Sequence, residues 1–132
     1  MNRTFVITSF LLVLLTGCAG GAAKTRHTVI MTDFSYTPNE IRVPAGEQIT
    51  LEISNSGAVV HNFIIVKSGA DIGADFDAAD EAGVYWKIEV LPGGSQTTAF
   101  TAPSEPGEYP IVCSTPGHFL AGMTGKLTVV AP

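Results

Sequence analysis

The sequence predicts an all-β Greek-key sandwich of seven to eight strands, which begins near His27 and is interrupted by one acidic insertion. The 132 residues fit one domain of ordinary size. Gly 14 and Pro 8 supply frequent turns. Between these turns, short apolar or alternating segments follow one another to the end of the chain, which is typical of a β-sandwich.

Eight segments have the character of strands. They are residues 28–32, 41–43, 48–54, 61–66, 84–91, 96–101, 107–114 and 125–130. The third alternates most clearly, with Ile49, Leu51 and Ile53 on one face. Residues 61–66 are almost wholly apolar, so we expect a central strand covered on both faces. Tyr109 is expected either to bond the backbone through its hydroxyl, as a tyrosine corner, or to pack in the core.

Residues 68–83 break the strand pattern. The segment is rich in alanine and glycine, and we expect an insertion between strands that contains a short helical turn near residues 78–81. It carries five acidic residues: Asp71, Asp75, Asp77, Asp80 and Glu81. Their spacing is not that of an EF-hand and no glutamate stands in the bidentate position, so a solvated loop is favoured over a calcium site.

The charge balance argues against nucleic acid as a partner. The formal net charge is −5, and removal of residues 1–17 with Arg3 would leave −5 − 1 = −6. A basic footprint for nucleic acid is therefore absent. An acidic surface favours solubility or attraction to a basic partner.

The first residues resemble a bacterial lipoprotein signal peptide. Arg3 precedes an apolar run over residues 5–15, which is shorter than the roughly 20 residues that span a bilayer but has the length of a signal-peptide core. The run ends in Leu15-Thr16-Gly17-Cys18, which looks like a lipobox. The alternatives are an ordinary secretory signal and an uncleaved anchor.

We therefore expect three parts along the chain. Residues 1–17 are a lipoprotein signal peptide, residues 18–26 a flexible tether that begins at lipidated Cys18, and residues 27–132 the folded domain. The domain would be exported and held by lipid on the extracytoplasmic face of a bacterial membrane, in the periplasm or at the cell surface. If Cys18 carries lipid, Cys113 has no disulfide partner and needs another role.

Residues 113–123, here called the ligand loop, contain three potential metal donors. Cys113, His118 and Met123 are each separated by four residues, and His61 stands far upstream at the start of an apolar strand. Two imidazoles, a thiolate and a weak axial thioether are the donor set of a type 1 copper site. The sequence therefore predicts one copper ion, cycling between Cu(I) and Cu(II), bound by His61, Cys113, His118 and Met123.

Two other chemistries use similar residues. A structural zinc site would more usually recruit a second cysteine or a carboxylate. A Cys–His nucleophile pair would need an orienting Asn or Asp and an oxyanion hole, neither of which the sequence suggests. Both are therefore less favoured than copper.

Residues 34–130 resemble the cupredoxin family of plastocyanins and azurins. The stretches that carry the resemblance are Phe34-Ser-Tyr-Thr-Pro38, Val43-Pro-Ala-Gly46, His61-Asn62-Phe63 and Gly122-Met123-Thr124-Gly125. The equal four-residue gaps of the ligand loop look most like those of auracyanins from filamentous photosynthetic bacteria. The resemblance implies a cupredoxin fold and assigns the same four copper ligands.

The resemblance also implies supporting roles. Asn62 matches a residue whose contacts connect the histidine strand to the cysteine loop and restrain the thiolate. Electrons are expected to pass at His118, within an apolar electron-transfer patch formed by Pro116, His118, Phe119 and Leu120. Val60 replaces a glycine whose carbonyl approaches copper in azurins, so four ligands are expected rather than five.

The predicted function is that of a monomeric blue copper electron carrier, not an enzyme. Its expected partners are transient redox proteins: a cytochrome, a quinol-oxidising complex, a reaction centre or an oxidase. Enzymes that combine type 1 copper with a further copper site need more histidines, and only His27 remains outside the proposed site. The alternative is a copper chaperone or sensor without a redox partner, although such proteins typically present open sites.

Overall fold

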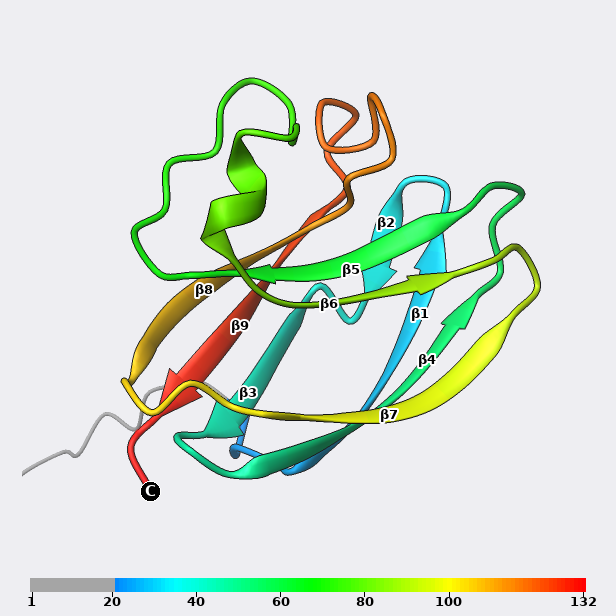
Figure 1. The fold of residues 1–132 in the computed structure, drawn as a ribbon. Helices are drawn as coiled ribbons and strands as arrows, with labels where there is room; N and C mark the ends of the chain where they lie inside the picture. Colours follow the sequence, from blue (N-terminus) through cyan, green and yellow to red (C-terminus); the bar gives the residue numbers. More distant parts are fainter. Residues whose placement is uncertain (1–20) are drawn as a thin grey trace, which may run out of the picture.

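Two β-sheets packed face to face form the fold (Figure 1). The structure is a computed structural model that describes residues 21–132. The first sheet has the order β2 (Ser35–Thr37), β1 (Arg26–Thr32), β4 (Gln48–Asn55) and β7 (Ser95–Thr101). The second has the order β3 (Glu40–Pro44), β9 (Thr124–Val130), β8 (Gly107–Val112), β5 (His61–Val66) and β6 (Val84–Val90). The predicted all-β sandwich is confirmed.

Parallel pairing occurs twice, between β1 and β4 and between β3 and β9, and the remaining pairs are antiparallel. The described residues hold nine strands, one more than the eight predicted segments. The additional strand is β2, which has three residues and pairs only with β1 at the edge of its sheet. The other strands match their predicted segments to within two residues at each end.

The predicted signal peptide and Cys18 lie outside the described residues, as do the first residues of the tether. Within the described part, no helix is long and apolar enough to cross a membrane.

Alternating side chains build the core between the sheets. Ile49, Leu51 and Ile53 of β4 all point inward and are at most 2% exposed. Strand β5 contributes Phe63 and Ile65 to the same core, while its other face places Ile64 in a second apolar cluster. The expectation that residues 61–66 are covered on both faces is confirmed.

The acidic insertion provides the cover for the second face of β5. Its only regular element is the 3-10 turn η1 (Asp80–Gly83), close to the predicted helical turn. Phe76, within this segment, is buried against Ile64 and Val112. Figure 1 shows the insertion, in green, beside the orange ligand loop at one end of the sandwich.

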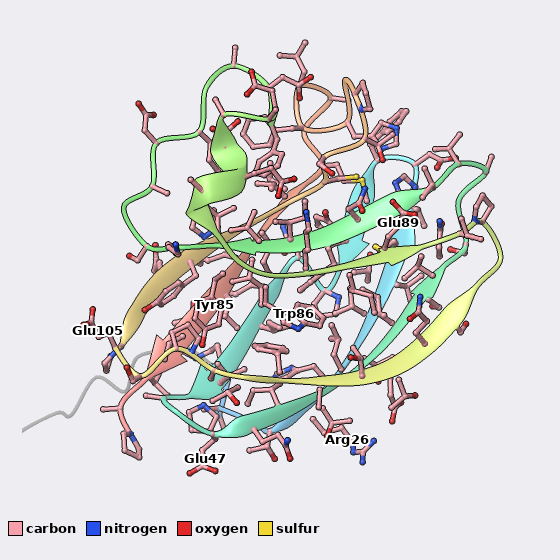
Figure 2. The ribbon with its side chains drawn as sticks, in the orientation of Figure 1. Arg26, Glu47, Tyr85, Trp86, Glu89 and Glu105 are labelled. Carbon is pink, nitrogen blue, oxygen red and sulfur yellow. The ribbon has the colours of Figure 1, made fainter. Side chains whose placement is uncertain are left out.

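Tyr109 forms the predicted tyrosine corner. Its hydroxyl donates a hydrogen bond of 2.9 Å to the backbone carbonyl of Glu105. This bond ties the β7–β8 connection to the start of β8, at the end of the molecule far from the ligand loop, where Glu105 is labelled in Figure 2.

Candidate metal centre

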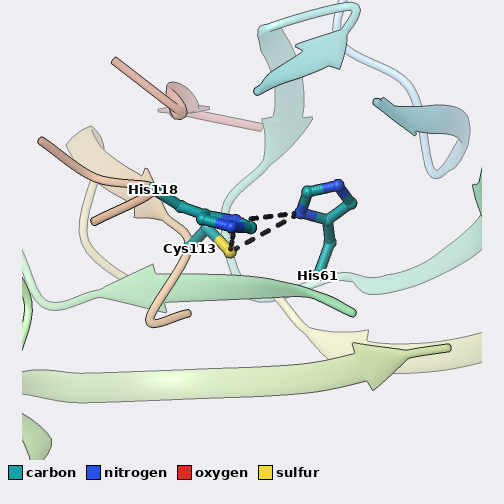
Figure 3. A group of neighbouring side chains, drawn as sticks. All are labelled: His61, Cys113 and His118. Atoms are coloured by element: carbon teal, nitrogen blue, oxygen red, sulfur yellow. Dashed lines mark hydrogen bonds between the residues drawn. The ribbon is translucent and has the colours of Figure 1, made fainter. Parts of the chain in front are cut away.

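Three donor side chains from two distant parts of the chain meet at one end of the second sheet (Figure 3). His61 begins β5, Cys113 directly follows β8, and His118 lies in the ligand loop between β8 and β9. Their ligand atoms all lie within 4.8 Å of one another, which is the one such cluster found among residues 21–132. All three residues are buried, at 0%, 0% and 7% exposure for His61, Cys113 and His118.

The separations of the donor atoms fit a single metal ion. Nδ1 of His61 lies 3.2 Å from Nδ1 of His118, and Cys113 Sγ lies 4.0 Å from the first nitrogen and 3.5 Å from the second. Donors at typical metal bond lengths of about 2.0–2.3 Å, arranged trigonally, stand roughly 3.5–3.8 Å apart. The three side chains are therefore held close to the arrangement that a trigonal metal site requires.

The ligand loop folds back on itself through backbone hydrogen bonds. The N–H of His118 bonds the carbonyl of Thr115, and the N–H of Met123 bonds the carbonyl of His118, each at 2.9 Å. Gly117 and Gly122 allow these turns because both have positive φ, at 81° and 92°. Met123 is fully buried, so its thioether belongs to the interior at this end of the sandwich.

Asn62 connects the histidine strand to the cysteine loop. Its backbone N–H points to Cys113 Sγ at 3.4 Å, and its side-chain amide donates to the hydroxyl of Thr115 at 3.4 Å. Thr115 in turn donates to the carbonyl of Val60 at 3.0 Å. Beneath this layer, the buried hydroxyl of Tyr36 donates to the carbonyl of Asn62 at 2.6 Å, and burial raises the pKa of Tyr36, so the hydroxyl stays protonated.

The turn between β1 and β2 contacts both histidines, which the sequence reasoning did not anticipate. Asp33 Oδ1 lies 2.8 Å from Nε2 of His61. The ring of Phe34, 46% exposed, packs edge-on against His118 with a centroid distance of 4.7 Å. Asp33 stands just outside the stretches that carry the cupredoxin resemblance. Phe34 opens one of these stretches, but nothing in its residue type marked it as a contact of His118.

The electrostatic setting suits metal binding. Burial, followed by the neighbouring His61, lowers the pKa of His118, so its imidazole is neutral near pH 7 and has a free lone pair. The backbone N–H of Ala58, together with His61, lowers the pKa of Asp33, so that carboxyl group is charged.

The acidic insertion supports the ligand loop from outside. Asp75 Oδ2 accepts a hydrogen bond of 3.1 Å from the N–H of Gly117. Phe119 is half-buried and packs against the cluster that contains Phe76. Two residues of the predicted electron-transfer patch, Pro116 and Leu120, are exposed, with Leu120 at 70%. Phe119 is only partly exposed, because one side of it packs against this cluster.

The donor set defines the class of protein. A fully buried thiol and two imidazoles, with a buried thioether in the same loop, combine soft ligands with borderline ones, as copper sites that cycle between Cu(I) and Cu(II) do. His61, Cys113, His118 and Met123 form a type 1 copper site, of the kind typical of electron transfer.

The chain belongs to the cupredoxin family, since residues 5–129 match the family model described as a cupredoxin-like domain. It is 29% identical to auracyanin-B of Chloroflexus aurantiacus over 72% of its own length and 47% of that protein, so it spans about half of this relative. It is 32% identical to the copper-resistant cuproprotein CopI of Rubrivivax gelatinosus, over 86% of this chain and 72% of that one.

The likeness to auracyanins extends to structure. The crystal structure of reduced auracyanin from Roseiflexus castenholzii matches with a TM-score of 0.71 and 34% identity, over 83% of this chain and 99% of that chain. The resemblance predicted from the ligand loop is thus confirmed. The auracyanins and plastocyanins among its relatives are non-enzymatic blue copper proteins, and this chain is of the same class.

Proposed function

We propose that this protein is an exported, lipid-anchored electron carrier that shuttles single electrons between redox proteins at a membrane surface. The observation that carries the proposal is the position of His118. This ligand is 7% exposed, yet it lies under Phe34 and within two residues of Leu120, both of which present apolar side chains to solvent. An apolar surface directly over a redox ligand suits brief contact with a partner.

The rest of the site suits repeated electron transfer. Copper, when bound, supplies the one-electron change between Cu(I) and Cu(II). The chain's own part is to hold the donors still. The hydrogen bonds of Asn62 and Thr115 join the histidine strand to the cysteine loop. The second apolar cluster supports the ligand loop through its contact with Phe119. Side chains fixed in this way have little to rearrange when the charge at the site changes.

The surface for the partner would include Pro116, Phe119 and Leu120 around His118, with Phe34 added from the β1–β2 turn. Redox encounters use small interfaces, below about 1,200 Å², which allows the partner to leave quickly. A cytochrome, a quinol-oxidising complex, a reaction centre or an oxidase would each be a suitable partner class. The tether beginning at lipidated Cys18 would keep the domain close to partners in the membrane.

Copper handling is the second candidate, because the protein is similar to a copper-resistant cuproprotein. Under this alternative the domain would store or transfer copper without a redox partner. Complete burial of Cys113 and His61 argues against rapid hand-over of metal. Reversible electron cycling separates the two functions, because a chaperone does not require it.

The first prediction concerns the colour of the copper-loaded protein. Full-length protein supplied with Cu(II) is expected to become intensely blue or green and to bleach when one electron per chain is added, then to recover on reoxidation. Absorption spectroscopy combined with a redox titration measures both. The Zn(II)-loaded protein, expected to be colourless, is the control. A colourless Cu(II) protein, or one that does not recover, would contradict the proposed function.

The second prediction concerns Leu120. Leu120→Asp places a charge in the apolar surface over His118 and is expected to slow electron transfer to a c-type cytochrome about tenfold, equivalent to about 1.4 kcal/mol. The absorption spectrum should not change, because no ligand is altered. Stopped-flow kinetics measures the second-order rate constant.

Ser104→Asp is the matched control for Leu120→Asp. Ser104 is exposed in the β7–β8 connection next to Glu105, which Figure 2 places at the far end from the ligand loop. This variant makes the same change in net charge, so any effect of net charge on the attraction to the cytochrome is the same in both variants. Equal rates for the two variants would remove Leu120 from the proposed surface.

A further inference from the structure

Asp33 and His61 form a close pair at the edge of the copper site. Asp33 Oδ1 lies 2.8 Å from His61 Nε2, on the side of the ring opposite to Nδ1. The imidazole is fully buried, whereas the side chain of Asp33 is 31% exposed. The carboxylate is therefore the polar group that meets the outer nitrogen of a ligand ring.

This contact determines which nitrogen of His61 carries the proton. An ionised carboxylate only accepts hydrogen bonds, so Nε2 must be the donor. In the neutral ring, Nδ1 then has the free lone pair, and Nδ1 is the atom that faces Cys113 Sγ at 4.0 Å and His118 Nδ1 at 3.2 Å. The correct tautomer for metal binding is thus selected before any metal arrives.

The surrounding turn fixes the carboxylate in this position. Asp33 Oδ2 accepts a hydrogen bond of 2.9 Å from the N–H of Ala58, so each oxygen has its own partner. Asn55, which is buried, shapes the same turn by donating to the carbonyls of Val59 and Val90 and by accepting the N–H of Gly57.

Gly57 is the residue that leaves room for the pair. A Cβ atom at this position would overlap Asp33 Oδ1 and would lie 2.8 Å from His61 Nε2. Since real Cβ atoms do not come this close to other atoms, any larger residue would push the carboxylate away from the ring. The pair therefore depends on a glycine 24 residues from Asp33 in the sequence.

We infer that Asp33 is a positioning residue of the copper site, whose negative charge and hydrogen bond orient His61 and stabilise the Cu(II) state over Cu(I). A carboxylate on the outer nitrogen makes an imidazole ligand more basic, and a more basic ligand favours the ion of higher charge. The inference rests on the copper site and not on the identity of any partner. It deepens the proposed function, because the reduction potential decides with which partners electrons can be exchanged.

The test compares four variants of the full-length protein by their reduction potentials, measured with small-molecule titrants. Asp33→Ala removes the charge and the bond, Asp33→Asn keeps the shape without the charge, and Gly57→Ala displaces the carboxylate without changing the net charge. Asp71→Asn is the control, because it removes one exposed negative charge in the insertion. Copper dissociation rates are measured in parallel.

Asp33→Ala and Gly57→Ala are expected to raise the potential and to weaken copper binding by about 10–100-fold. If the affinity for Cu(II) falls ten times more than the affinity for Cu(I), the reduction potential rises by about 59 mV. Asp33→Asn should give a smaller rise in the same direction, and Asp71→Asn should give none. In the Cu(I) protein, which is suited to NMR, the Nε2–H proton of His61 should exchange with water faster in Asp33→Ala than in the unaltered protein.

An unchanged potential in Asp33→Ala would overturn the inference, as would an equal rise in Asp71→Asn. A purely structural role would lower the melting temperature of the copper-free protein and leave the potential of the loaded protein unchanged. If an Asp33 variant does not fold, the reduction potential of Gly57→Ala still tests whether the Asp33–His61 contact affects the copper site. The potentials are obtained without a protein partner, so failure of the proposed electron-carrier function would leave this result intact.

Discussion

Cys113→Ser is expected to abolish the visible colour of the Cu(II) protein and to reduce its copper affinity by more than the 10–100-fold that loss of a supporting hydrogen bond typically costs. The thiolate is the one strongly soft donor of the site, and a hydroxyl replaces it poorly as a ligand for copper. Absorption and paramagnetic resonance spectra of the Cu(II)-loaded variant, with copper titration, measure the effect.

The copper-free Cys113→Ser protein should still fold. The new hydroxyl is buried, but the backbone N–H of Asn62, which lies 3.4 Å from Sγ, can donate to it. A buried hydroxyl without any partner would cost about 1–3 kcal/mol, and this partner reduces that cost. Loss of colour with a nearly unchanged melting temperature of the copper-free protein would therefore report on the ligand and not on the fold.

The other cysteine provides the matched control. Cys18→Ser makes the same chemical change outside the described residues and is expected to leave the colour intact. If Cys18 carries the lipid, this variant should move from the membrane fraction to the soluble fraction, whereas Cys113→Ser should stay with the membrane. Loss of colour in Cys18→Ser would contradict the division of roles between the two cysteines.

The strands could be predicted where the pattern of side chains is local. Residues in β4 alternate between core and solvent. Residues 63–66 of β5 are all apolar because the two faces of this strand meet two different apolar clusters. Strand β2 was missed because Ser35–Thr37 is too short for a periodic pattern and exists through its pairing with β1. Its formation depends on a neighbour rather than on its own composition.

The metal ligands could be predicted for a different reason. Three of them lie within one loop at regular spacing, and this combination of residue types is rare. Their ligand chemistry was therefore enough to identify them without any knowledge of the fold. Asp33 and Gly57 could not be found in this way. They reach His61 only because the β1–β2 turn and the turn before β5 lie together in the folded protein. The role of Phe76 in the second apolar cluster could not be predicted either, because it is a single aromatic residue in an acidic segment.

Phe63→Ala is expected to lower the free energy of unfolding of the copper-free protein by about 3–5 kcal/mol. Phe63 is 1% exposed, two residues after His61, and its ring meets that of Tyr36 edge-on at a centroid distance of 5.4 Å. Removal of the ring leaves a cavity between the sheets that the packed strands cannot fill. Small domains have only about 5–15 kcal/mol of stability in total, so the loss is large. Urea denaturation followed by circular dichroism measures it.

Phe34→Ala is the control for this substitution. It removes the same ring from a site that is 46% exposed. The expected cost is below about 1.5 kcal/mol, because little of the ring is buried and its aromatic contact is the edge-on one with His118. The copper-free form is needed for both measurements because copper, by binding the native state, adds stability that depends on its concentration.

Adding Cu(II) to the Phe63→Ala protein then separates packing from coordination. No donor is removed, so a folded fraction should still become coloured, and copper should raise the denaturation midpoint of the variant as it does that of the unaltered protein. A cost below about 1 kcal/mol would mean that the sheets close over the cavity. In that case the packing of Tyr36 against Phe63 would not be what holds His61 in position. The rigidity of the copper site would then come from the ligand loop and its hydrogen bonds to Asn62 and Asp75.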